Sequence, residues 1–193
     1  MEASWILISF YTPLYKKMAA RLQKSCDAWG IPYDIECVPD QGSWEENCCY
    51  KAEFILKKLL EHKKPVLWVD ADAEIVQQLP ETFDGTFGTI INHDLDETHA
   101  SKVISGVVYA EYCEEAVLII KKWIAICKVF DSKEWDQIAL REALKDEKPL
   151  ALPLSYYAVY DRVEEGDSPV IIHYQASRLL KKVCNNEIID LFS

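Results

Sequence analysis

The chain has 193 residues, which is enough for one domain with a substantial hydrophobic core. Half of the residues are hydrophobic and 27% are charged, a composition typical of globular proteins. The net charge of −11 argues against a nucleic-acid-binding protein, because phosphate backbones need a basic face. It does not exclude an anionic small ligand, since a bound metal ion reverses the local charge.

The seven cysteines are odd in number and include no Cys-x-x-Cys pair. This pattern predicts reduced, buried thiols rather than a disulfide framework or a zinc site. The first residues lack a basic lead-in, and Pro13 and Lys16 interrupt the apolar run that follows. We therefore expect no signal peptide, no membrane span and a soluble, cytoplasmic protein.

Apolar runs alternate with amphipathic stretches from the N-terminus onward, which predicts an α/β domain. We expect strands over residues 5–10, 33–38 and 65–69. Helices are expected between them, one beginning at Pro13 and ending near Gly30, and one over about residues 45–62.

The pattern changes after residue 72. We expect strands over 85–91 and 103–109, separated by an acidic loop, and helices over 114–129 and 135–145. Strands over 150–160 and 170–174 and a terminal helix from residue 178 complete the chain. This order predicts one domain over residues 1–193, with a nucleotide-binding half over about 1–80 and a mixed half over about 81–193.

Two carboxylates, Asp70 and Asp72, follow directly after the short apolar strand at 65–69. Carboxylates this close repel one another, so each must be exposed to water or neutralised by a cation. Hard divalent ions such as Mg²⁺ and Mn²⁺ prefer oxygen ligands and commonly bridge a protein carboxylate to a substrate phosphate. The pair therefore predicts a metal and diphosphate site, with a solvated acidic turn as the alternative.

Ligands of parallel α/β sheets collect beyond the carboxyl ends of the strands. The end of the first strand, at Tyr11 and Thr12, is therefore expected to share one crevice with the two aspartates. The chain contains neither Gly-x-Gly-x-x-Gly nor a Gly-rich loop ending in Gly-Lys-Ser/Thr. Their absence disfavours dinucleotide oxidoreductases and P-loop enzymes.

Four features occur in order along the chain: Tyr11-Thr12, Asp70-x-Asp72, Asp136-Gln137 and His173. This order resembles the GT-A fold glycosyltransferases, the nucleotide-diphospho-sugar transferases, and most of all their glycogenin-like group. The resemblance covers nearly the whole chain. It implies a Rossmann-like single domain with a mixed central sheet and helices on both faces. It also implies metal-dependent transfer of a sugar from a nucleotide-diphosphate donor, as a rule a UDP-sugar, to an acceptor hydroxyl.

By resemblance, Asp70, Asp72 and His173 would hold the metal ion, Mn²⁺ or Mg²⁺. A neutral imidazole suits Mn²⁺ better than Mg²⁺. The alternative for His173 is a core histidine bonded to the backbone. The glycogenin-like pattern continues His-x-x-Gly-x-x-Lys-Pro-Trp, whereas this chain lacks the Gly and the Pro-Trp. Arg178 would then replace the lysine beside the diphosphate, because a guanidinium can grip two oxygens.

The resemblance also predicts residues that bind the donor. An aromatic side chain would stack on the base, a basic residue would lie near the phosphates, and a small pair would allow the sugar to approach the backbone. The residues that match are Tyr11, Thr12, Tyr15, Asp70, Lys51, Ser105 and Gly106. Core packing is the alternative for Tyr15, and a solvated side chain is the alternative for Lys51.

Asp136 and Gln137 are the predicted catalytic residues. In an inverting enzyme Asp136 would take the proton of the acceptor hydroxyl as general base. In a retaining enzyme it would hold sugar hydroxyls while Gln137 or an oxygen of the leaving group lies by the anomeric carbon, and the resemblance favours retention. The alternative is that Asp136 only caps a helix.

Two other functions fit parts of the pattern. Haloacid-dehalogenase-type phosphatases also use Asp-x-Asp after a strand, but they carry it on the first strand and with Thr or Val where this chain has Glu74. A sugar-nucleotide-binding relative without turnover is the non-enzymatic alternative. The sequence leaves the acceptor open between a glycan, a protein and a lipid.

Overall fold

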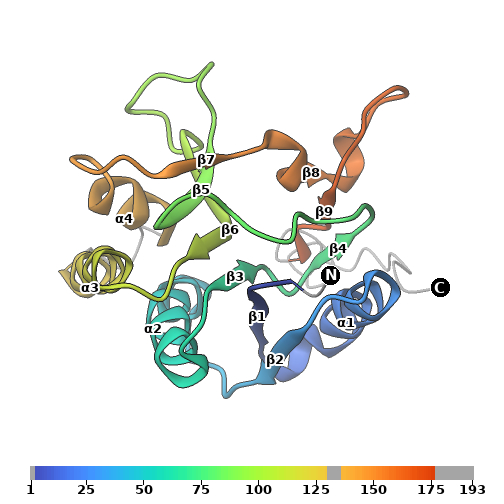
Figure 1. Cartoon of the computed structure of the whole chain (residues 1–193), viewed down its shortest axis with the longest axis horizontal. Coiled ribbons are helices and arrows are strands. Elements are labelled where there is room, and N and C mark those ends of the chain that lie inside the picture. Colours follow the sequence, from blue (N-terminus) through green and yellow to red (C-terminus); the bar gives the residue numbers. More distant parts are fainter. Residues whose placement is uncertain (1–2, 130–135, 177–193) are drawn as a thin grey trace.

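The structure, a computed structural model, describes residues 3–129 and 136–176. These residues form a six-stranded mixed sheet of order β2-β1-β3-β6-β5-β7 and a second, three-stranded sheet of order β4-β9-β8 (Figure 1). Helix α1 covers one face of the large sheet, and helices α2, α3 and α4 cover the other face.

The first part of the chain alternates strand and helix as the sequence predicts. Its elements are β1 (Ile6–Tyr11), α1 (Lys16–Trp29), β2 (Tyr33–Cys37), α2 (Trp44–His62) and β3 (Val66–Val69). Both β2 and β3 pair in parallel with β1, so the strands end at the same edge of the sheet.

The helix boundaries in this part have local causes. Gly30 ends α1 with φ +65°, a left-handed conformation that glycine adopts without steric cost. Ser43 and Glu46 begin α2 with a capping box, in which each side chain accepts a bond from the other residue's backbone N–H.

The later strands enter the same sheet in both directions. Strand β6 (Val103–Ala110) runs antiparallel to β3 and is buried at all eight positions, as expected for a central strand. Strand β5 (Phe87–Ile91) pairs antiparallel with β6, and β7 (Leu150–Leu152) pairs in parallel with β5. Helices α3 (Glu114–Val129) and α4 (Asp136–Ala143) follow β6 in the chain.

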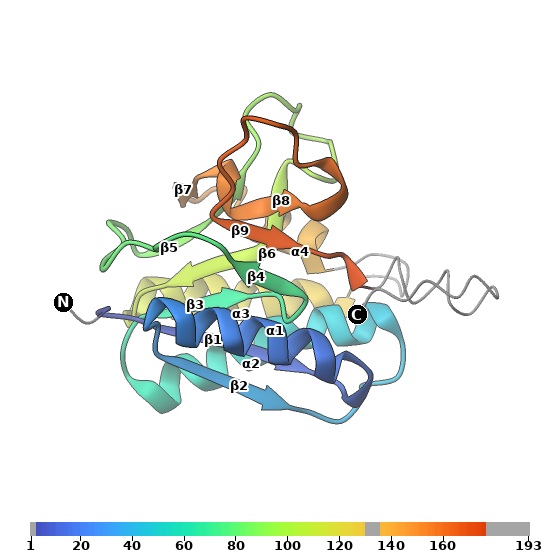
Figure 2. The ribbon, with the colours of Figure 1, turned by 90° about the vertical axis from the view of Figure 1, so that its right-hand side faces the viewer.

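The small sheet is the element that positions the site. It contains β4 (Ala73–Ile75), β8 (Ala158–Val159) and β9 (Ile171–His173), and it lies beside the large sheet in Figure 2. In the antiparallel register of β4 and β9, His173 lies opposite Ala73, the residue after Asp72. Pairing of these two short strands therefore brings a histidine from the end of the chain to the aspartates that follow β3.

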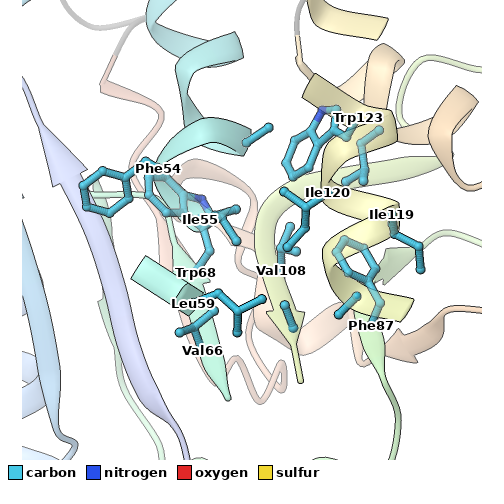
Figure 3. Packing of buried hydrophobic residues seen from close by; sticks show 14 of the residues in the cluster. Phe54, Ile55, Leu59, Val66, Trp68, Phe87, Val108, Ile119, Ile120 and Trp123 are labelled. Atoms are coloured by element: carbon cyan, nitrogen blue, oxygen red, sulfur yellow. The ribbon is translucent and has the colours of Figure 1, made fainter. Parts of the chain in front are cut away.

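Each face of the large sheet has its own core. Figure 3 shows the core under α2 and α3, where Phe54, Trp68 and Trp123 are among the buried side chains. The other core lies under α1 and includes Trp5, Leu22 and Tyr109. Because both faces of the sheet are buried, the sequences of β1, β3 and β6 are mostly apolar and do not alternate between apolar and polar residues.

Three predictions need correction. Residues 150–160 do not form one strand: β7 ends before Pro153, a 3₁₀ turn occupies Leu154–Tyr157, and β8 belongs to the small sheet. Strand β4 was not predicted. Of the six described cysteines all are free, but only Cys26 is buried, Cys37 is exposed and the others are half-buried.

The terminal helix predicted from residue 178 lies outside the described residues, as does the first residue of the helix predicted over 135–145. None of the helices in the described part of the chain combines the length and the apolar character that a membrane crossing requires.

Candidate functional site

A cleft of about 620 Å³ opens where β1 and β3 end, within the range of volumes typical for small-molecule sites. Every predicted site residue in the described part of the chain lines it; these are Tyr11, Thr12, Tyr15, Lys51, Asp70, Asp72, Ser105, Gly106, Asp136, Gln137 and His173. The remaining predicted residue, Arg178, lies outside the described residues. Side chains that are up to 162 positions apart in the sequence thus meet in one cleft.

Asp70, Asp72 and His173 form a group whose ligand atoms all lie within 4.8 Å of one another. Asp70 is held by its backbone, whose N–H donates to the Gly106 carbonyl, and by the indole N–H of Trp68, which donates to Oδ1 at 2.9 Å. Oδ2 of Asp72 accepts a bond from the Ala176 N–H at 2.7 Å. The group is therefore fixed by β3, β6 and the segment after β9.

Burial shifts the pKa values of Asp72 and His173. Burial and the neighbouring charge of Asp70 raise the pKa of Asp72 to about 6. Burial also lowers the pKa of His173 to about 4, against the opposing effect of Asp70. The imidazole is consequently neutral at pH 7. Its Nε2 lies 3.1 Å from the Tyr156 carbonyl, which only accepts, so Nε2 carries the proton and the Nδ1 lone pair is available.

This donor set fits a divalent metal ion. Two carboxylates and a neutral imidazole are the ligand types that Mn²⁺ accepts, and the backbone bond to His173 orients the ring as an outer-shell partner does. The backbone bond that was the alternative for His173 is therefore present, and it leaves Nδ1 available as a ligand atom.

Lys51 is the buried cation of the cleft. It is only 6% exposed, so it is not a solvated lysine. Its Nζ lies 3.0 Å from Asp70 Oδ1 and 2.9 Å from Asp136 Oδ2, and it donates to the carbonyl and the hydroxyl of Ser105. Burial alone would lower the pKa of Lys51, but the charges of Asp136 and Asp70 outweigh it and raise the pKa. The ammonium therefore links Asp70, a member of the Asp70–Asp72–His173 group, to α4.

Asp136 and Gln137 enter the cleft at the start of α4. Asp136 is 2% exposed, its carbonyl accepts a bond from the Trp123 indole N–H, and its Oδ2 pairs with Lys51. A carboxylate buried this deeply needs a compensating charge, which Lys51 supplies. Gln137 donates to the Ala100 carbonyl at 2.6 Å, which ties α4 to the loop between β5 and β6.

Ser105 and Gly106 lie in the middle of β6 beside the metal group. A Cβ at position 106 would lie 2.9 Å from Cε2 of Tyr157 and 3.2 Å from Cε1 of His173. No side chain fits there without displacing a ring, so the glycine is required for the close approach of Tyr157 and His173.

The other end of the cleft is formed by the loops after β1 and β2. Tyr11 ends β1, and Thr12 is the N-cap of the 3₁₀ turn Pro13–Tyr15. Tyr15 is half-buried, and burial together with the charge of Asp72 raises its pKa to about 12. Its hydroxyl is therefore protonated at neutral pH.

Sequence reasoning missed several cleft residues, namely Asp40, Trp44, Asn47, Tyr157 and Gln175. Asp40 accepts from the Gly42 N–H and from Asn47, which folds the loop after β2 into a turn. The spacing Asp40-x-Gly42 was a detectable signal for such a turn. For Tyr157, expected in a strand, no sequence signal existed.

Comparisons with known proteins bear on the fold. Neither the known protein families nor the curated proteins contain a match to this sequence. Among solved structures, the chain is similar to a glycosyltransferase involved in the glycosylation of the major capsid of PBCV-1. The TM-score is 0.70 at 12% identity, over 93% of this chain and 98% of the other. The predicted fold class, a GT-A-like mixed α/β fold, is confirmed.

Proposed function

We propose that this protein is a metal-dependent glycosyltransferase that moves a sugar from a nucleotide-diphosphate donor, preferentially a UDP-sugar, to an acceptor hydroxyl. The observation that carries the proposal is the Asp70–Asp72–His173 group, which lies with Lys51 in the cleft of a GT-A-like fold. A protein that only bound a nucleotide would need no such set of metal ligands. The subgroup resemblance to glycogenin-like enzymes rests on the same three residues.

In this proposal Asp70, Asp72 and His173 hold Mn²⁺ or Mg²⁺. When bound, the cation would neutralise the charge that develops on the departing diphosphate. Lys51 adds a fixed positive charge next to Asp70, since its ammonium is held in place by three groups of the protein. A preorganised charge of this kind stabilises a leaving group without reorganisation during the reaction. Arg178, by resemblance, would bind the diphosphate as well.

The reacting sugar would lie between β6 and the start of α4. Ser105 and Gly106 of β6 line this part of the cleft together with Asp136 and Gln137. One oxygen of Asp136 is engaged by Lys51, which suits a residue that holds sugar hydroxyls in a retaining reaction. In an inverting reaction Asp136 would instead accept the proton of the acceptor hydroxyl.

The nucleotide would occupy the end of the cleft at Tyr11, Thr12 and Tyr15, where an aromatic ring can stack on the base. Residues of about 1–80 would then bind the nucleotide, and residues of about 81–193 would bind the sugar and the acceptor. This function does not require a basic surface for nucleic acid, and it is therefore compatible with the net charge of −11.

The first test is thermal unfolding with UDP, GDP, dTDP and CMP, each with and without Mn²⁺ or Mg²⁺. A ligand at a hundred times its dissociation constant adds about 2.7 kcal/mol of stability, which is readily detected. We expect a shift with UDP that requires the metal. Absence of a shift with every nucleotide and metal would refute the proposal, and a shift with another nucleotide would change the donor.

Variants connect the shift to the site. Asp72→Ala and His173→Ala should each abolish the metal-dependent shift. Matched controls are His93→Ala and Asp94→Ala, which change exposed residues outside the cleft and should leave the shift intact. If all four variants shift as the wild type does, the three-residue group does not bind the metal.

Asp136 is tested by its separate effects on binding and on transfer. Asp136→Asn should keep the metal-dependent nucleotide shift and lose most of the release of sugar from the donor. A variant that releases sugar at the wild-type rate would mean that Asp136 has no catalytic role.

A further inference from the structure

Gln175 has an unusual backbone conformation at the edge of the cleft. Its φ is +48°, and among the described residues only one other non-glycine residue, Lys63 at the end of α2, has a positive φ. The turn has its cause in Asp72, because this residue accepts hydrogen bonds from the backbone N–H groups on both sides of Gln175. Asp72 makes these two bonds with different atoms. Its carbonyl accepts from the Tyr174 N–H at 3.0 Å, and its Oδ2 accepts from the Ala176 N–H at 2.7 Å. Residue 175 must turn between these two fixed points.

The turn brings the Gln175 side chain to the cleft, where its Nε2 donates to the Tyr157 hydroxyl at 3.2 Å. Within residues 3–129 and 136–176 this is the only hydrogen bond of its amide. One further N–H and the carbonyl oxygen of the amide are therefore available to a ligand. An amide that both donates and accepts matches a hydroxyl group, which does the same.

Tyr157 is fixed beside the metal group. Its ring centroid lies 4.6 Å from that of His173, and its ring edge fills the space that Gly106 leaves. Its hydroxyl oxygen accepts the bond from Gln175, so the proton of the phenol can be donated to a ligand oxygen. The backbone turn at Gln175 and the packing of the Tyr157 ring against His173 fix the positions of the amide and the phenol. The two polar groups are therefore preorganised for a ligand.

The charges of the cleft indicate which acceptor this pair suits. Eight cleft residues come from residues 81–176 of the chain. Apart from Asp136, which pairs with Lys51, and His173, all of them are uncharged; they are Ser101, Ser105, Gly106, Gln137, Tyr157 and Gln175. Lys51, the cation among the described cleft residues, is already paired with two carboxylates. An acceptor with a phosphate would bring a charge that none of the described side chains in this part of the cleft compensates.

We propose that Gln175 and Tyr157 bind the acceptor, and that this acceptor is a neutral sugar whose hydroxyls bond the amide and the phenol. This inference rests on the proposed function and specifies the acceptor of the same site. Asp72 would then serve two purposes, as a ligand of the metal and as the residue that sets the position of the acceptor-binding amide.

The test uses Gln175→Gly, because glycine adopts φ +48° without strain, so the variant removes the side chain and its amide while the backbone turn is kept. The donor is the UDP-sugar whose nucleotide gives the metal-dependent shift. The acceptors are the methyl glycosides of glucose, galactose and mannose, with farnesyl phosphate and a serine-containing peptide for comparison. Transfer is measured against acceptor concentration, and donor hydrolysis is measured without acceptor.

We expect Gln175→Gly to raise the acceptor KM about tenfold, the effect of one lost hydrogen bond to a polar ligand. Donor hydrolysis and the nucleotide shift should stay within about twofold of the wild type. Tyr157→Phe, which keeps the ring, should raise the acceptor KM as well. Gln78→Ala, an exposed glutamine outside the cleft, is the matched control and should change nothing.

The possible failures are distinct. An unchanged acceptor KM in Gln175→Gly, or an equal loss of donor hydrolysis, would overturn the assignment of Gln175 to the acceptor. Faster transfer to farnesyl phosphate or to the peptide than to any methyl glycoside would overturn the neutral sugar. A wild-type protein that neither binds nucleotide nor hydrolyses donor would instead refute the proposed function on which the inference rests.

Discussion

Replacing Lys51 by Met should destabilise the protein strongly, because it removes the charge that compensates two carboxylates. The side chains of Lys51 and Asp136 are 7% and 4% exposed, and their charged atoms lie 2.9 Å apart. Asp70, whose Oδ1 lies 3.0 Å from Lys51 Nζ, is 32% exposed. Water can therefore compensate Asp70 after the substitution but has little access to Asp136.

The magnitude follows from this difference in burial. With an effective dielectric constant of 20, two charges about 3 Å apart attract by about 5 kcal/mol before desolvation is subtracted. Removing one partner of a buried ion pair typically costs about 3–5 kcal/mol. We expect a loss in this range for Lys51→Met, which for a chain of this length corresponds to a decrease in Tm of about 10 °C.

The assay is urea unfolding of the metal-free protein, with Lys57→Met as the matched control on the same helix. Lys57 pairs with Glu36 at 3.2 Å, but its side chain is 50% exposed, so its loss should cost less than about 1 kcal/mol. Adding Asp136→Asn to Lys51→Met should restore part of the stability, because it removes the uncompensated charge. Equal stabilities of Lys51→Met and Lys57→Met would refute the reasoning.

Two further predictions concern the site and the sheet edge. Gly106→Ala should cost about 1–3 kcal/mol in urea unfolding and weaken the Mn²⁺-dependent nucleotide shift, because its Cβ would displace the Tyr157 ring next to His173; wild-type values in both assays would show that the contact is not tight. Lys58→Met should cost about 3 kcal/mol at pH 7, because Lys58 is 4% exposed and lies 2.7 Å from Asp34. Burial alone would raise the pKa of Asp34, but Lys58 outweighs it and lowers the pKa, so this stabilisation is present above the ordinary carboxyl pKa of about 4 and is lost as the pH falls through the lower folded value. Urea unfolding between pH 7 and 3 should therefore show a smaller loss of stability with acid in Lys58→Met than in the wild type, and parallel curves would contradict this account.

Much of the fold followed from the sequence, because local patterns decide it. The alternation of apolar runs and amphipathic stretches predicted the first three strands and the two helices between them, with boundaries within one to three residues. Glycine 30 and the polar residues before α2 set helix ends through bonds within a few positions of the chain. Such interactions need no knowledge of distant segments.

The residues of the candidate site could also be predicted, since Asp70-x-Asp72 follows a buried strand and a histidine occurs late in the chain. Their charges made them conspicuous, because strand ends in a core are seldom acidic. The sequence predicted which residue types meet, and the cleft contains each of those within the described residues.

Only the tertiary structure decided how these residues are held. The sequence was equally compatible with a solvated side chain at Lys51. Its burial between Asp70 and Asp136 depends on the packing of α2 against β3 and α4. Tyr157 and Gln175 gave no signal, because their positions depend on a two-residue strand, a 3₁₀ turn and two backbone bonds to Asp72. The periodic pattern of a sequence specifies an element and its buried face, whereas the contacts between segments a hundred residues apart form only when those faces pack.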